Sequence, residues 1–457
     1  MKTKITSLLG ASIIASTSLA QVSPAISSWL RNTTGITGRH YVSGNSTPIN
    51  DTYLANVQTV KYSTNFVYVN CTGIPSYVIG PYLDGNTNHG GDNANLYKIP
   101  LVPVANTGSL SPTTPNNIGI FINGVSLFDY RDGVSWKNST SSLCGGPIFP
   151  PCVGDGIWNR DAVVGERLGF DCSKGHPAMT NYHHHQNPSA FNLDLTVIST
   201  ICNLYASDAL YVINPTVHSP LIGYAYDGFP IYGAYGYKNV DGTGGIVRMK
   251  SSFTLRSMTT RTTLYTSTVT VTSGPPVNAT YPLGYFKEDY QYVPTTTLTP
   301  DYLDIHNGRF CVTPEYPLGT YCYFATVDAN HNSAYPYVVG PTFYGVKNVT
   351  KPTSITETTT TYTTAATTGI QNSSLEMAIN IYPNPSADLI MIQSNELLKN
   401  DLQVELSNVT GQIVAKKEFY QGSTICYFET TGLYNGTYFL TVIDKGTKKT
   451  FKVIINR

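Results

Sequence analysis

Three consecutive histidines, His183, His184 and His185, are the feature of this 457-residue sequence with the clearest chemical potential. Tyr182 precedes them. On an extended strand the side chains alternate between two faces, so His183 and His185 share one face while Tyr182 and His184 share the other. Two imidazoles at positions i and i+2 lie close enough to bind one metal ion, although such an ion needs further ligands from elsewhere in the chain.

The further ligands of such an ion are expected among the nearby histidines and acids. His176, His218 and Asp227 complete our candidate set, although the pair Asp227-Gly228 is equally typical of a turn. Imidazole suits copper, zinc or iron, whereas a carboxylate favours harder ions. We expect copper first, with zinc or calcium as alternatives. The competing interpretation is that these imidazoles only hydrogen-bond to the backbone and to tyrosines in a polar core.

An enzymatic role is the second hypothesis, because histidines beside carboxylates can act as general acids and bases. His183 or His185 would be the base, and Asp227 or Glu288 would orient it. Arg309 would bind an anionic group of the substrate. The chain has no GxSxG, HExxH or P-loop motif, so the sequence specifies neither a reaction nor a catalytic residue.

The composition excludes some partners and favours one fold class. Only 12% of the residues are charged, and 28 basic residues balance 28 acidic ones, which argues against a nucleic-acid partner. The chain contains 34 Tyr, 39 Gly and 28 Pro, which predicts mainly β-structure with many turns. The tyrosines would also suit a third hypothesis, a structural or adhesive surface protein that forms filaments or contacts cell-surface polysaccharide.

The N-terminus is typical of a secretory signal peptide over residues 1–20. Lys2 and Lys4 are followed by a short apolar stretch, and Ser18-Leu19-Ala20 is a small-residue cleavage site. No other stretch has the roughly 18 uninterrupted apolar residues of a spanning helix. We therefore expect an exported mature chain without a transmembrane segment.

Export makes the eight cysteines candidates for disulfide bonds. Their positions suggest three pairs and leave two over, although the sequence alone does not fix the pairing. The suggested pairs are Cys144 with Cys152, Cys172 with Cys202, and Cys311 with Cys322, and Cys71 and Cys426 remain.

The chain is expected to divide after one long region, residues 21–348. A Thr-rich stretch over residues 349–370 lacks apolar periodicity and is interpreted as a linker. In residues 371–457, short alternating strands separated by Asn, Gly and Asp turns predict a small β-sandwich.

The final block resembles a known family. Ile381-Tyr382-Pro383-Asn384-Pro385, Gly411-Gln412 and the run from Gly432 to Tyr438 are followed by a basic last strand. In order and spacing they resemble the type IX secretion sorting domain of Bacteroidota, an Ig-like sandwich. The resemblance implies the type IX secretion machinery as a partner, and a protein that is secreted or attached to the outer-membrane surface.

The long region resembles the YHYH domain family. The name motif corresponds to Tyr182 to His185, with His184 where the family has its second Tyr, and further motifs follow in order across the region. The resemblance names the domain and leaves its activity open. The density of Tyr, Pro and Gly and the recurring strand-like runs of this region predict that the domain is large and β-rich. The motif residues beyond the candidate metal ligands are Tyr182, His184, Glu288, Asp289, Asn307, Arg309 and Glu315.

Overall fold

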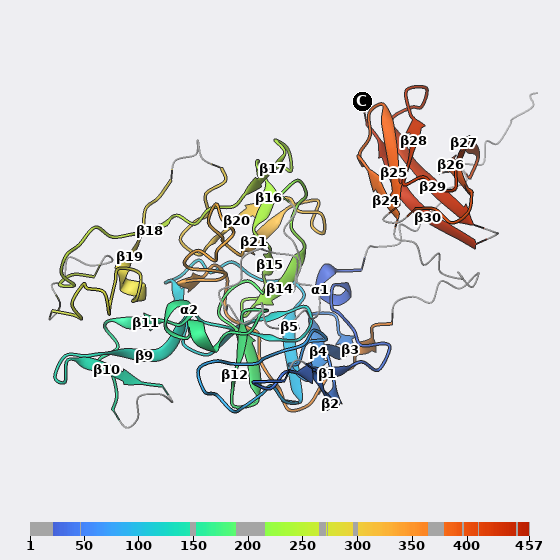
Figure 1. Cartoon of the computed structure of the whole chain (residues 1–457). Coiled ribbons are helices and arrows are strands. Elements are labelled where there is room, and N and C mark those ends of the chain that lie inside the picture. Colours follow the sequence, from blue (N-terminus) through green and yellow to red (C-terminus); the bar gives the residue numbers. More distant parts are fainter. Residues whose placement is uncertain are drawn as a thin grey trace, which may run out of the picture. The chain divides into compact units, whose positions relative to one another are not determined.

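The computed structural model forms two compact units, residues 1–362 and residues 363–457, and each is described by itself. Figure 1 shows the helices and strands of both. The described residues are 22–45, 47–146, 152–188, 215–264, 271, 273–295, 300–363, 379–394, 397–409, 411–444 and 447–456. The expected signal peptide, residues 1–20, lies outside them.

A mixed eight-stranded sheet forms the centre of the first unit, in the order β12-β13-β8-β7-β14-β15-β21-β20. Strand β13 runs parallel to its neighbour β8, and β15 runs parallel to its neighbour β21. All other neighbouring strands of this sheet are antiparallel. The strands are β7 (Asn117–Phe121), β8 (Ser126–Phe128), β12 (Gly175–Ala178), β13 (Asn181–His184), β14 (Leu221–Ala225), β15 (Pro230–Tyr232), β20 (Gly308–Cys311) and β21 (Thr320–Phe324). The histidine motif therefore lies near one end of the sheet.

Smaller sheets complete the first unit. They pair β1 (Thr37–His40) with β2 (Ile49–Leu54), β6 (Ser111–Pro112) with β22 (Thr342–Phe343), β16 (Tyr235–Tyr237) with β17 (Ile246–Arg248), and β18 (Phe253–Leu255) with β19 (Tyr290–Tyr292). A three-stranded sheet contains β10 (Ser142–Gly145), β9 (Arg131–Lys137) and β11 (Asn159–Asp161). A four-stranded sheet contains β23 (Thr360–Thr361), β3 (Val57–Tyr62), β4 (Phe66–Cys71) and β5 (Asn95–Pro100).

Helices are short throughout the described part of the chain. They are α1 (Pro24–Ser27), α2 (Ala162–Gly165) and the 3-10 helices η1 (Arg167–Gly169) and η4 (Lys287–Asp289). Within the described ranges, none combines the length and the apolar character that crossing a bilayer requires. The predicted mainly-β fold class is confirmed.

Tyrosine is a core residue in the first unit. Tyr97, Tyr224, Tyr232 and Tyr323 are fully buried within its main hydrophobic core. Among the described residues of this unit, every tyrosine is buried or half-buried. The high tyrosine content therefore reflects interior packing there rather than an exposed contact surface.

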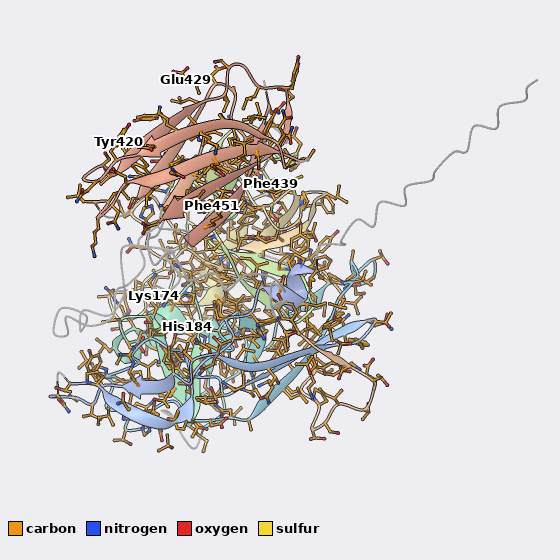
Figure 2. The ribbon with its side chains drawn as sticks, turned by 90° about the vertical axis from the view of Figure 1, so that its right-hand side faces the viewer. Lys174, His184, Tyr420, Glu429, Phe439 and Phe451 are labelled. Carbon is orange, nitrogen blue, oxygen red and sulfur yellow. A yellow bond between two sulfur atoms is a disulfide. The ribbon has the colours of Figure 1, made fainter. Side chains whose placement is uncertain are left out.

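The second unit is a β-sandwich with its own core, as the alternating pattern predicted. One sheet contains β24 (Ile379–Tyr382), β25 (Leu389–Ser394) and β28 (Ile425–Glu429). The other contains β27 (Ile413–Phe419), β26 (Leu402–Asn408), β29 (Gly436–Asp444) and β30 (Thr447–Ile455). Burial alternates along β28, so one face of the strand joins the core. Tyr420 and Phe439, labelled in Figure 2, are among the exposed aromatic side chains of this unit.

The Thr-rich stretch differs from the expected linker in its first part. Val349 is buried, Thr350 forms a β-bridge with Lys98, and β23 pairs with β3. Threonine favours strands, so this part of the run extends a neighbouring sheet at its edge. Residues 364–370 lie outside the described residues.

The structure forms the disulfide between Cys144 and Cys152. Cys172 is also disulfide-bonded, and its suggested partner, Cys202, lies outside the described residues. The suggested bond between Cys311 and Cys322 is not formed, since both residues are free and their sulfur atoms are 3.3 Å apart. The remaining cysteines, Cys71 and Cys426, are free and buried.

Candidate metal centre

A hairpin places three of the candidate histidines together. β12 and β13 pair so that His176 lies directly opposite His183. Directly opposed residues of an antiparallel pair project from the same face. His185 follows the end of β13, two residues after His183, and shares its face as the alternation predicted. One ligand atom from each of the three rings lies within 4.8 Å of the others.

A carboxylate that the sequence analysis did not select completes the cluster. Helix α2 begins after Asp161, whose side chain accepts a hydrogen bond from the Val163 amide, and Glu166 caps its C-terminus. Glu166 Oε2 lies 3.3 Å from His176 Nε2 and 3.2 Å from His185 Nε2. No hydrogen bond satisfies Glu166 Oε2 or His176 Nε2 within the described part of the chain.

Backbone carbonyls fix the tautomers of His183 and His185. His183 Nδ1 lies 2.9 Å from the Asn181 carbonyl oxygen, and His185 Nδ1 lies 2.5 Å from that of Asp129. A carbonyl oxygen only accepts hydrogen bonds, so each Nδ1 carries the hydrogen, and each neutral ring keeps a lone pair on Nε2. These two Nε2 atoms face each other at 3.1 Å. Two lone pairs at that distance repel unless a proton or a metal ion lies between them.

Burial and mutual contact set the protonation of the cluster. Burial alone would raise the pKa of Glu166, but its contacts with His176 and His185 hold that pKa well below the usual range. Burial, together with the charges of His176 and His185, lowers the pKa of His183 well below its usual value. Burial would also lower the pKa of His185, but Glu166 raises it above the usual value. The cluster is therefore an ionised carboxylate beside imidazoles of very different basicity.

A cavity of about 600 Å³ opens onto the cluster. The Phe128 ring stacks on His183, with 3.8 Å between ring centroids, and the edge of Phe170 packs against His176 at 4.9 Å. Besides the four cluster residues, the lining consists of Asp84, Gly85, Asn86, Asn88, Pro115, Asn116, Phe128, Arg131, Asp132, Gly133, Pro177, Ala178 and Met179. A small molecule could therefore reach the nitrogen atoms of the cluster.

The opposite face of β13 has a packing role. The Tyr77 hydroxyl lies 2.9 Å from His184 Nε2, and burial lowers the pKa of His184 to about 3. The Tyr182 hydroxyl donates a 2.8 Å hydrogen bond to Asp171. Figure 2 labels His184 together with Lys174, another buried residue of this hairpin region. As expected, His183 and His185 lie on one face of the strand, and Tyr182 and His184 lie on the other.

The structure does not bring His218 and Asp227 to this cluster. The His218 ring packs against Tyr232 of β15, and three strands, β8, β7 and β14, separate β15 from β13. Asp227 lies in the turn between β14 and β15, where it accepts a hydrogen bond from the Tyr323 hydroxyl at 2.5 Å. At roughly 4.8 Å per strand, neither residue can share an ion with the histidines of β13.

The remaining motif residues hold loops and strands in place. Asp289 pairs with the fully buried Arg261 at 2.7 Å, and Asn307 donates to the backbone carbonyls of Phe324 and Val338. The Arg309 guanidinium donates to the carbonyls of Lys238, Pro300 and Tyr237. Glu288 accepts from the Asn159 amide at 2.7 Å, and Glu315 accepts from the Tyr232 hydroxyl at 2.8 Å.

Two family models match the chain. The one described as YHYH protein matches residues 96–336, which is more than half of the 457 residues. The one described as Secretion system C-terminal sorting domain matches residues 380–456. The four cluster residues lie within the first match, and the β-sandwich coincides with the second. This sorting domain indicates export through the type IX secretion system, to the outer surface or beyond it. No curated protein matches the chain.

Proposed function

We propose that this chain, which belongs to the YHYH protein family, binds one divalent transition-metal ion through His176, His183, His185 and Glu166. The separations between ligand atoms carry the proposal. The Nε2 atoms of His183 and His185 are 3.1 Å apart. Glu166 Oε2 lies 3.2 Å from His185 Nε2 and 3.3 Å from His176 Nε2. Ligands held about 2.0–2.1 Å from a tetrahedral ion are about 3.3 Å apart.

The surroundings of the rings support the same proposal. A histidine that ligates a metal commonly donates its other ring N–H to a backbone carbonyl or a carboxylate. The carbonyl oxygens of Asn181 and Asp129 accept these N–H groups from His183 and His185. The Asp129 side chain is in turn held by Arg131 at 2.5 Å. The rings are therefore already oriented for an ion.

Copper is the first candidate for the ion, and zinc is the second. Three imidazoles and one carboxylate suit either ion, and copper binds such ligands most tightly among the divalent first-row metals. Calcium needs six to eight oxygen ligands, which a cluster dominated by nitrogen atoms does not supply. The donor set therefore favours a transition metal.

The cavity supports a second candidate function, metal-assisted catalysis on a small molecule. Four protein ligands fill a tetrahedral shell, which is typical of a structural ion. Catalysis would need an added fifth position or release of Glu166, so that water or substrate could bind the ion. The opening of the cavity at His176, His183 and His185 is compatible with that step.

The test is elemental analysis of the mature chain purified without a histidine tag. We expect about one copper or zinc ion per chain, retained through dialysis against buffer. A metal content near zero, still near zero after incubation with either ion and dialysis, would show that a shared proton rather than a metal lies between His183 and His185.

A further inference from the structure

We infer that His40, Asp51 and His89 form a second divalent-cation site, which does not depend on the proposed function of the first. His40 ends β1 and Asp51 lies on β2, while His89 belongs to the segment between β4 and β5. One ligand atom from each lies within 4.8 Å of the others. Two imidazoles and one carboxylate form a ligand set that zinc accepts, with water in the fourth position.

The buried carboxylate of Asp51 is the first observation behind this site. His40 Nδ1 lies 2.9 Å from Asp51 Oδ1, and the two side chains are only 10% and 4% exposed. Asp51 Oδ2 has no hydrogen-bond partner in the described residues. The neighbouring Tyr53 hydroxyl donates to the Gly90 carbonyl at 2.5 Å, and burial and the nearby Asp51 carboxylate raise the pKa of that hydroxyl. A buried carboxylate oxygen without a donor is costly, and a cation would remove that cost.

The backbone around Asp51 leaves room for the carboxylate. The pairing of β1 with β2 is irregular between Thr37 and Arg39, which places Gly38 beside Asp51. A Cβ atom at Gly38 would lie 2.7 Å from Asp51 Oδ2 and 2.7 Å from Ile74 Cγ2. Any other residue would therefore displace the carboxylate from its position next to His40.

His89 supplies the exposed side of the site. Its ring stacks on His40, with 4.2 Å between centroids and 13° between planes. The hydrogen bond from Tyr53 to Gly90 ties the backbone next to His89 to β2. An imidazole nitrogen binds an ion in the plane of its ring, so ion binding requires the exposed His89 ring to turn out of this stack. The ligand atoms, now within 4.8 Å of one another, would then lie about 3.3 Å apart.

The segment that carries His89 also forms part of the first cavity. Asp84, Asn86 and Asn88 line that cavity a few residues before His89. An ion held by His40, Asp51 and His89 would therefore fix the C-terminal end of the segment from Asp84 to His89, which forms one wall of the cavity. We assign the second ion a structural role that keeps the wall in place.

Zinc titration of the mature full chain tests this site, with bound zinc counted after equilibrium dialysis. We expect His89→Ala and Asp51→Asn each to bind one zinc ion fewer per chain than the natural sequence. His89 is exposed, so its replacement should leave the thermal unfolding transition of the zinc-free protein unchanged. His331→Ala is the matched control, because His331 lies in neither cluster and pairs with Tyr235.

The variants separate the two sites. His183→Ala/His185→Ala should lose the first ion and keep the one that His89→Ala removes. Equal zinc binding by the natural sequence, His89→Ala and Asp51→Asn would overturn the second site, whatever the result at the first. If His89→Ala and Asp51→Asn each lose an ion while His183→Ala/His185→Ala loses none, the second site is upheld and the first is rejected.

Discussion

Glu166 and Asp227 are both buried carboxylates of the first unit, but their surroundings differ. Asp227 accepts three hydrogen bonds, from the Tyr323 hydroxyl and from the amides of Phe229 and Gly345. Glu166 Oε2 faces the Nε2 atoms of two imidazoles and has no satisfied hydrogen bond in the described part of the chain. A carboxylate whose donors come from its own fold stabilises that fold. One that faces the Nε2 atoms of two imidazoles, as Glu166 does, can share either a proton or an external cation with them.

The histidines follow the same division. His218 donates from Nδ1 to the Ser219 carbonyl and packs singly among aromatic rings. His183 and His185 also donate from Nδ1 to carbonyls, but their Nε2 atoms converge. Burial and a single hydrogen bond are thus common to both regions. The candidate metal centre differs from the region of His218 because the Nε2 atoms of two of its histidines lie close together.

The largest effect is expected from removing both converging rings. His183→Ala/His185→Ala should lose the ion, with affinity reduced more than about 100-fold, because two of four ligands disappear. Isothermal titration with copper and with zinc would measure the change. His184→Gln is the control on the opposite face, and it should retain the metal. Unchanged affinity in the double variant would contradict the assignment of these ligands.

Asp227→Ala should produce the next largest effect, on stability instead of on metal. It leaves the Tyr323 hydroxyl and two buried amides without their acceptor, so the free energy of unfolding should fall by about 3–5 kcal/mol. Chemical denaturation would measure this loss, and metal content would be determined on the folded fraction. Loss of the ion without loss of stability would reverse the distinction between Asp227 and Glu166.

Glu166→Gln should weaken metal binding by about 10- to 100-fold while the fold is retained. The amide keeps the size of the side chain but removes its charge. An uncharged amide group next to the imidazole nitrogens is a poorer metal ligand than the carboxylate. Competition with a chromophoric chelator would measure the affinity. An affinity equal to that of the natural sequence would exclude the Glu166 carboxylate from the ligand set.

Over any single pH unit, the pH dependence of metal affinity should be the smallest of these effects, and it should arise at His185. Glu166 raises the pKa of His185, so a proton competes with the ion at the same nitrogen. Below that pKa, affinity should fall about tenfold for each pH unit, as one proton is released per ion bound. Titrations from pH 5 to 8 would measure it. In Glu166→Gln the fall should begin at a lower pH, and an identical profile would contradict the pairing of these residues.

The period of a strand was enough to predict how the histidine motif divides. Side-chain alternation placed His183 and His185 on one face and His184 on the other, and the structure agrees. The mainly-β class followed from composition in the same direct way. The sandwich of the second unit was predictable because its strands are long enough to show alternation.

Other parts of the site could not be derived from spacing. Glu166 reaches the cluster because the short helix α2 ends beside β12 and β13, and no sequence rule relates that helix to the hairpin. The order of the central sheet depends on strands of three to five residues, which carry too little pattern to specify partners. For Asp227, the turn and the buried acid fitted the sequence equally well. The three groups that donate hydrogen bonds to Asp227 identify it as an acid that holds the turn in place.

Anomalous X-ray scattering tests the central claim most directly. Crystals of the mature chain grown with copper, and separately with zinc, would be measured above and below the absorption edge of each ion. We predict an anomalous peak about 2.0–2.2 Å from Nε2 of His176, His183 and His185 and from Oε2 of Glu166. No peak between these atoms in either crystal, with the rings placed as described, would contradict the account.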